Sequence, residues 1–244
     1  MLKFSPQNDK TKKLVGKRFA QKWLRNKRRV YSLDLLSGWA CPFARECKSK
    51  VVKIGRKSRI QDGPKCKFRC FSASGEVLFP LVYKLRKENW RQLLKAKTTD
   101  KMFRLLYSSL PKNAGIVRIH VGGDFFSQQY FDAWIALAYS RPDILFYAYT
   151  KAIAYWQARR DRIPSNLVLT ASFGGIQDNL IDKLGFKSTI VVDRKCDAKR
   201  KGLPIDESDS LAANPANQRS FALVLHGTQP ANTIGAKLVC RRKK

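Results

Sequence analysis

Apolar residues in the second half of this chain fall into short strand-like segments that alternate with segments of helical periodicity. The pattern predicts strands at 115–121, 144–149, 166–171, 189–192 and 221–226, with helices at 129–139, 152–160 and 177–184 between the first four. Strands that alternate with helices through short loops form a parallel sheet of βαβ units. We therefore expect an α/β fold built on a partial, barrel-like parallel (βα) sheet.

The first half of the chain is less regular. An apolar segment at 31–36 predicts one more strand, and apolar residues three and four apart between 76 and 110 predict two helices, separated near Asp100, which could cap the second. Residues 195–219 are polar and lack a period, so we expect a long loop that is functional or mobile. The expected organisation is a basic arm over 1–30, a single α/β domain over 31–240 with a cysteine-rich insertion at 41–70, and a basic tail at 241–244.

The charge of the chain is extreme for a globular protein. Its 244 residues include 49 Lys and Arg against 18 Asp and Glu, a formal net charge of +31, while a hydrophobic content of 44% argues against global disorder. Such a surface attracts polyanions, because each cation that neutralises a phosphate releases counterions. Nucleic acid, either DNA or RNA, is therefore the expected partner.

The cations expected to contact phosphates lie in the N-terminal arm and in the cysteine-rich insertion. A solvated basic surface is the simpler alternative, and for the arm it is a tail that docks Trp23 on the core. No stretch approaches the roughly eighteen apolar residues that cross a bilayer, so no membrane partner is expected. The candidate nucleic-acid-binding residues are Lys12, Lys13, Lys17, Arg18, Arg28, Arg29, Arg56, Lys57 and Arg59.

Four of the six cysteines are clustered, at Cys41, Cys47, Cys66 and Cys70. The first thirty residues carry eleven Lys or Arg and no secretory signal, so we expect a cytoplasmic, reducing location, where clustered cysteines are more often metal ligands than disulfides. The spacings C-x5-C and C-x3-C are longer than the C-x2-C pairs of zinc ribbons, and iron–sulfur clusters accept less regular spacings. An iron–sulfur cluster is the leading interpretation, structural zinc is the alternative, and four unligated thiols are the simplest case.

The sharpest loops of the sequence follow the expected strands, where active sites of parallel α/β proteins lie. Gly122, Gly123 and Asp124 follow the first central strand, and Lys151 follows the second. Adjacent glycines allow a ligand to approach the backbone, and the carboxylate of Asp124 could accept hydrogen bonds from an amine or a ribose hydroxyl. We expect Asp124 and Lys151 to be catalytic; the simpler interpretation is a tight turn with Asp124 as a helix cap.

The two histidines, His120 and His226, occur in apolar strand segments. Histidines in such positions are more often hydrogen-bonded core residues than ligands, so neither is assigned a metal. The sequence contains no Gly-x-Ser-x-Gly, His-Glu-x-x-His or phosphate-loop motif, which leaves classical hydrolases and nucleoside triphosphatases without support.

Three segments together resemble the phage gene product eighty-eight family. They are IVRIHVGGDFFSQQYFDAWIALAYSRPDILFYAYTK at 116–151, CPFAREC at 41–47 and RCFSAS at 69–74, and the likeness covers about 31–238 in order. The resemblance implies a phage origin and expression in the cytoplasm of a bacterial host. It implies no particular reaction.

A more distant similarity links the chain to the radical S-adenosylmethionine superfamily. That superfamily has a partial parallel barrel, an early three-cysteine [4Fe–4S] site and a Gly-Gly-acidic turn after a strand. The resemblance implies that Cys41, Cys47 and Cys70 hold the cluster and that Gly122, Gly123 and Asp124 face the amine of S-adenosylmethionine. The superfamily's compact C-x3-C-x2-C block is absent, and Cys66 or Cys196 could supply a fourth thiolate that closes the site.

Three functions fit these observations. The first is a phage-encoded iron–sulfur protein that engages nucleic acid through its basic surface, with radical or redox chemistry at the strand ends. The second is a zinc-stabilised nucleic-acid-binding protein without catalysis. The third is an enzyme that acts on nucleic acid through Asp124, Lys151 and Asp193.

Overall fold

The computed structural model describes residues 1–55 and 57–241. A seven-stranded sheet with the order β1-β2-β5-β6-β7-β8-β9 forms its centre, and every neighbouring pair is parallel except β1 with β2. The parallel sheet of βαβ units is thus confirmed, and the sheet remains open between β1 and β9. Its strands are β1 (Ser5–Pro6), β2 (Arg29–Leu33), β5 (Ala114–Ile119), β6 (Leu145–Thr150), β7 (Leu167–Ser172), β8 (Ser188–Val192) and β9 (Phe221–Val224).

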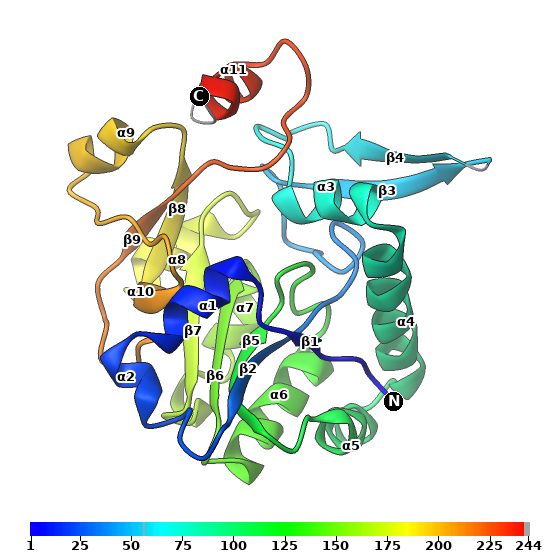
Figure 1. Ribbon diagram of the computed structural model, residues 1–244, viewed down its shortest axis with the longest axis vertical. Helices are drawn as coiled ribbons and strands as arrows, with labels where there is room; N and C mark the ends of the chain where they lie inside the picture. Colours follow the sequence, from blue (N-terminus) through cyan, green and yellow to red (C-terminus); the bar gives the residue numbers. More distant parts are fainter. Residues whose placement is uncertain (56, 242–244) are drawn as a thin grey trace.

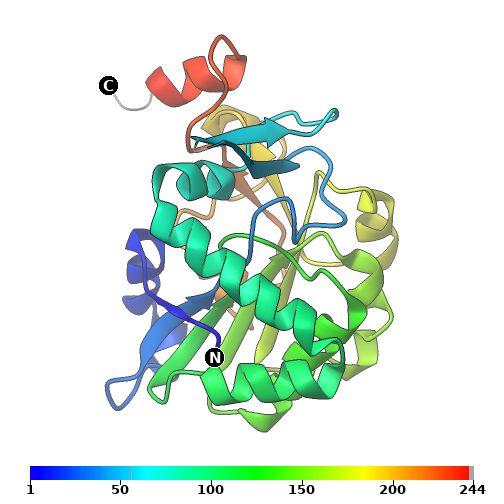
Figure 2. The same cartoon turned by 90° about the vertical axis from the view of Figure 1, so that its right-hand side faces the viewer.

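Helices on one face of the sheet bury the larger hydrophobic core, as Figure 2 shows for α4 and α5. Successive strand residues alternate between the two faces, so Phe146 and Ala148 point into this core whereas Leu145 and Tyr147 point into the other. The helices on this face are α4 (Pro80–Ala96), α5 (Thr99–Ser109), α6 (Gln128–Ser140), α7 (Ile153–Gln157) with the 3-10 turn η1 (Arg160–Arg162), and α8 (Asp178–Leu184).

The N-terminal segment covers part of the opposite face of the sheet (Figure 1). Helices α1 (Asp9–Val15) and α2 (Arg18–Gln21) bury Leu14 and Ala20 against the strands, and α10 (Ser210–Ala213) packs beside them. Trp23 packs against the same core, as the docked-tail alternative anticipates. Residues 1–30 are therefore an integral layer of the domain, and the apolar members of the segment determine its position.

The cysteine-rich insertion carries a separate two-stranded antiparallel sheet, formed by β3 (Ser49–Ile54) and β4 (Lys57–Asp62). Helix α3 (Phe71–Leu78) follows it and ends before Pro80, which begins α4. The sequence pattern did not predict α3. Helix α5 is capped by Thr98, whose side chain accepts a hydrogen bond from the backbone N–H of Lys101, so the expected cap Asp100 is wrong by two residues.

The segment after β9 crosses back over the strand ends to the insertion and then forms α11 (Ile234–Arg241) (Figure 1). Gln229 fixes it there, because its side chain accepts a hydrogen bond from the N–H of Arg69 (2.8 Å) and donates one to the C=O of the same residue (3.2 Å). Ser74 adds a bond from its hydroxyl to the C=O of Thr228 at 3.2 Å. We call residues 225–233 the crossing segment. None of the described helices is long and apolar enough to cross a membrane.

Candidate functional site

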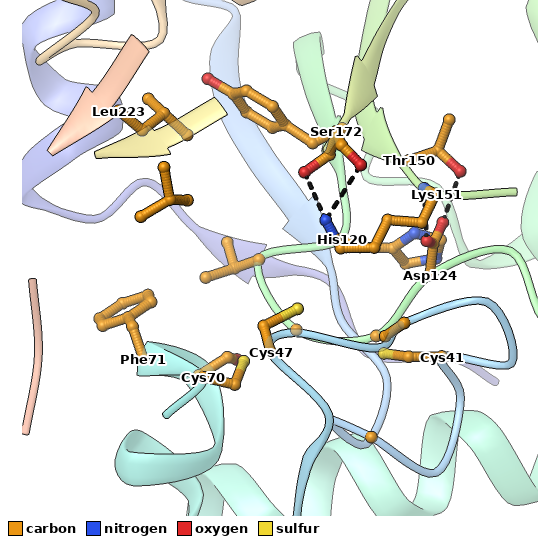
Figure 3. Close-up of a pocket in the computed structure, with 18 of the residues that line it drawn as sticks. Cys41, Cys47, Cys70, Phe71, His120, Asp124, Thr150, Lys151, Ser172 and Leu223 are labelled. Atoms are coloured by element: carbon orange, nitrogen blue, oxygen red, sulfur yellow. Dashed lines mark hydrogen bonds between the residues drawn. The ribbon is translucent and has the colours of Figure 1, made fainter. Parts of the chain in front are cut away.

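A cavity of about 530 Å³ lies at the carboxyl ends of the parallel strands (Figure 3). The loop after β2, the start of α3 and the ends of five strands all contribute to its wall, so residues distant in the sequence meet there. Its lining includes Gly38, Cys41, Ala44, Cys47, Cys70, Phe71, Ser72, Arg118, His120, Gly122, Gly123, Asp124, Tyr149, Thr150, Lys151, Ser172, Val191, Leu223 and His226.

Three of the predicted ligand cysteines, Cys41, Cys47 and Cys70, line one end of this cavity as free thiols. Burial raises the pKa of Cys41 well above its usual value and that of Cys70 to about 11, and the neighbouring sulfurs add to both shifts. Three thiolates in so dry a space would repel one another. A cationic metal group among them would remove that repulsion, which makes this the natural ligand set of the chain.

The backbone at Cys70 favours an anionic sulfur. Cys70 is the N-cap of α3, and the N–H groups of Ser72 and Ala73 interact with its sulfur, which opposes the effect of burial on its pKa. The N–H of Cys70 itself donates to the hydroxyl of Ser49 at 3.1 Å, and this bond ties α3 to the start of β3.

Cys66 and Cys196 lie elsewhere. The thiol of Cys66 donates to the C=O of Phe68 at 3.0 Å and lies 3.6 Å from the hydroxyl of Ser49, beside a smaller cavity that Gln229 also lines. Cys196 is exposed on α9 (Lys195–Arg200). The structure therefore brings together three of the four clustered cysteines, and the two candidates for a fourth ligand are outside the cavity.

The spacing of the three cysteines distinguishes two kinds of metal group. Within residues 1–55 and 57–241, no three Cys, His, Asp or Glu side chains are arranged to hold a single metal ion. A tetrahedral zinc site with Zn–S bonds of about 2.3 Å needs sulfurs only about 3.8 Å apart. A four-iron cluster binds each thiolate on its own iron and so accepts wider spacings.

The predicted Gly-Gly-Asp turn forms the wall next to the cysteines. Gly123 has a φ of +92°, which favours glycine, and a Cβ at Gly122 would overlap the hydroxyl of Ser72. The N–H of Asp124 donates to the C=O of Ala40 at 3.0 Å, and the N–H of Leu35 donates to the C=O of Gly122 at 2.8 Å. These bonds join the turn directly to the loop that carries Cys41.

Asp124 and Lys151, the two predicted catalytic residues, are buried and held by hydrogen bonds. The carboxylate of Asp124 accepts from the hydroxyl of Thr150 (2.7 Å) and from the N–H groups of Lys151 (2.8 Å) and Phe125 (2.7 Å). Burial raises its pKa, and these bonds oppose the shift. Asp124 does not cap α6, which is capped by Ser127 instead.

The ammonium group of Lys151 is turned toward the end of β7. It donates to the C=O (3.0 Å) and hydroxyl (2.8 Å) of Ser172 and to the C=O of Phe173 (2.6 Å), and Figure 3 shows its bonds to Ser172. Asp193, the third residue expected to act at the strand ends, lines a neighbouring cavity with Asp178 and Glu46.

The deep end of the cavity contains a buried ion pair that sequence reasoning missed. Arg118 on β5 donates to the carboxylate of Asp209 at 2.6 Å, and the hydroxyls of Tyr147 and Tyr149 donate to the same carboxylate at 3.0 and 2.9 Å. Burial, together with Asp209, raises the pKa of both tyrosines, which remain protonated donors. A lone Arg within the apolar segment 115–121 was the available signal, but its partner lies 91 residues away in the expected loop.

The two histidines differ. His120 is buried, with its Nε2 3.0 Å from the hydroxyl of Tyr130, and burial lowers its pKa to about 3, so its ring is neutral. This arrangement agrees with a hydrogen-bonded core residue. His226 is exposed and lies against the ring of Phe71 at 4.7 Å, so its expected place in the core is wrong because β9 ends two residues earlier.

The candidate nucleic-acid-binding residues divide between two surfaces. Lys12, Lys13, Lys17 and Arg18 lie on or beside α1 and α2, and Lys57 and Arg59 lie on β4, at the other end of the molecule (Figure 1). Arg28 forms an ion pair with Asp143, and Arg29 begins β2. Arg56 and residues 242–244 of the basic tail lie outside the described residues.

Comparison with known proteins places the chain among bacteriophage proteins. It is 30% identical to the Gene 88 protein of Mycobacterium phage L5 over 134 residues, which are 50% of this chain and 48% of that protein, so the chain spans about half the length of this curated relative. No solved structure matches the chain. The model of the family Gene product 88 matches residues 2–243, and the chain therefore belongs to the Gene product 88 family.

Proposed function

We propose that this phage protein binds a [4Fe–4S] cluster through Cys41, Cys47 and Cys70 in the host cytoplasm, beside a cavity that takes S-adenosylmethionine. The main support is the convergence of these three thiols with the Gly-Gly-Asp turn on one cavity. The order along the sheet also supports it, because the cysteine loop follows the first parallel strand and the turn follows the second. The radical S-adenosylmethionine superfamily combines a three-cysteine cluster and a Gly-Gly-acidic turn on a partial parallel barrel.

The donor set fits such a group. Three soft thiolates are the usual ligands of iron–sulfur clusters, and the absence of a fourth cysteine among the described cavity residues leaves one iron free for a small molecule. When bound, a cluster of this kind supplies one-electron chemistry. The cavity volume of about 530 Å³ lies within the range of small-molecule sites.

The residues of the turn suit the amine of S-adenosylmethionine. An ionised carboxylate can accept about four hydrogen bonds, and Asp124 accepts three from Phe125, Thr150 and Lys151. One position therefore remains for an ammonium donor. Lys151 and Thr150 act as positioning residues in this proposal, because they orient the carboxylate of Asp124 and the end of β7.

The second half of the proposal is that the protein engages nucleic acid, which its net charge of +31 supports. A zinc-stabilised binding protein remains an outcome of the test, although the three cavity cysteines are not arranged for a single ion.

Anaerobic purification followed by absorption spectroscopy and iron, sulfide and zinc analysis tests the cluster. We expect broad absorption near 400 nm with about four irons and four sulfides per chain, lost in Cys41→Ala, Cys47→Ala and Cys70→Ala. Cys66→Ala and Cys196→Ala are the matched controls and should retain full iron. Zinc alone, no metal, or equal loss in the controls would overturn the proposal.

Binding of S-adenosylmethionine is measured separately by equilibrium dialysis with the iron-loaded protein. Asp124→Asn keeps the shape of the side chain but removes its charge, so we expect it to weaken binding by about tenfold or more while iron content is unchanged. Unchanged binding would show that the carboxylate does not contact the ligand.

A further inference from the structure

The β3–β4 hairpin is a narrow ribbon that projects from the domain at the same end as the strand-end cavity (Figures 1 and 2). Six residues of each strand pair in continuous antiparallel register, from Ser49 opposite Asp62 to Ile54 opposite Lys57. Only the base is buried, at Ser49 and Val51, and the outer half is exposed. A ribbon that leaves so much backbone and side chain in solvent contributes little to the core of its own domain.

The exposed part of the hairpin is positively charged because the nearby acids are already neutralised. Glu46 forms an ion pair with Lys67 at 2.5 Å, and Asp62 forms one with Arg69 at 2.6 Å. These are the only acidic residues of segment 45–70. Among the described residues, no acid pairs with the exposed cations of the hairpin, which are Lys53, Lys57 and Arg59.

The shape of the hairpin selects one form of nucleic acid. Two strands about 4.8 Å apart and about 20 Å long fit the major groove of B-form DNA, which is about 12 Å wide and admits a two-stranded ribbon. The major groove of A-form RNA is deep and too narrow for side chains to read. Duplex DNA therefore matches both the charge and the width of this element.

We propose that the β3–β4 hairpin inserts into the major groove of duplex DNA and holds it beside the cysteine-lined cavity. This inference rests on the nucleic-acid half of the proposed function and names its substrate class and its contact element. Ser49, the first residue of the hairpin, links the two sites, because its hydroxyl accepts a hydrogen bond from the N–H of Cys70. DNA held by the hairpin is thus positioned next to the cavity, and the cations on α1 and α2 are not required for it.

The test compares two triple variants of the full chain in duplex DNA binding. The hairpin variant is Lys53→Gln/Lys57→Gln/Arg59→Gln, and the control is Lys13→Gln/Lys17→Gln/Arg18→Gln on the α1–α2 surface. Both remove two lysines and one arginine that are exposed, so the net charge is the same. Fluorescence anisotropy with a labelled 20-base-pair DNA between 50 and 200 mM salt gives the slope of log K against log salt.

We expect the hairpin variant to reduce the magnitude of this slope by about 2.7, at about 0.9 for each lost phosphate contact, and the control to change it by less than about 1. An equal change in both variants, or none in the hairpin variant, would overturn the hairpin as the contact element while leaving nucleic-acid binding intact. Equal or tighter binding of duplex RNA would overturn the choice of DNA. If the wild type binds no nucleic acid, that half of the proposed function fails, and iron analysis of the same preparation tests the other half independently.

Discussion

Arg86 is expected to be among the most important single side chains for the stability of the domain. It extends from α4 into a buried space where its Nη1 lies 3.0 Å from the carboxylate of Glu76 and 2.6 Å from the hydroxyl of Ser72, and its Nη2 lies 3.8 Å from the carboxylate of Asp34. The side chains of Arg86 and Glu76 are 7% and 0% exposed. Arg86→Ala would leave two carboxylates in the interior without their cation.

Breaking a buried ion pair by removing one partner costs about 3–5 kcal/mol, a large share of the roughly 5–15 kcal/mol that stabilises a typical domain. The same helix offers a matched control in Arg91, whose pair with Glu88 is half exposed and worth about 0–1 kcal/mol. Urea unfolding followed by circular dichroism at 25 °C measures both variants. A loss below about 1 kcal/mol in Arg86→Ala, or equal losses in the two, would refute this reasoning.

Two further predictions concern stability. Burial lowers the pKa of Lys187 to about 8, so the unfolded chain binds its proton more tightly, and the free energy of unfolding should rise by about 2–3 kcal/mol between pH 8 and 10.5; Lys187→Met should lack this rise in urea titrations at each pH, and an identical pH profile would contradict it. Gly122→Ala should destabilise by about 1–3 kcal/mol through overlap with Ser72, whereas Gly75→Ala in α3, where a Cβ meets no atom within 4 Å, should stabilise by about 0.5–1 kcal/mol; thermal melts that rank the two variants the other way would contradict this.

The second half of the fold could be predicted from sequence because its strands are buried on both faces. Segment 144–149 is apolar at nearly every position, and β6 forms at Leu145–Thr150, one residue later. Short loops between such strands and amphipathic helices leave little choice of topology. The cavity could also be anticipated, because Gly122, Gly123, Asp124 and Lys151 all follow strands and therefore meet at one edge of the sheet.

The parts that sequence reasoning missed depend on side chains that bind distant backbone. Segment 195–219 has no hydrophobic period, yet it forms α9 and α10 because the carboxylate of Asp206 accepts hydrogen bonds from four backbone N–H groups and that of Asp209 binds Arg118. The N-terminal segment was expected to be an arm because its charge is conspicuous, whereas the burial of Leu14 and Ala20 determines its place. Polar partners far apart in sequence leave no local pattern.

The crossing segment sets the time at which the cysteine side of the cavity can be completed during synthesis. Gln229 holds the backbone of Arg69, the neighbour of Cys70, across 160 residues of sequence. A ribosome that adds about 5–20 residues per second needs roughly 8–30 s to cover that interval. The thiols of Cys41, Cys47 and Cys70 are thus made early but enclosed late, which leaves an interval in which a scaffold or chaperone can reach them before the wall closes.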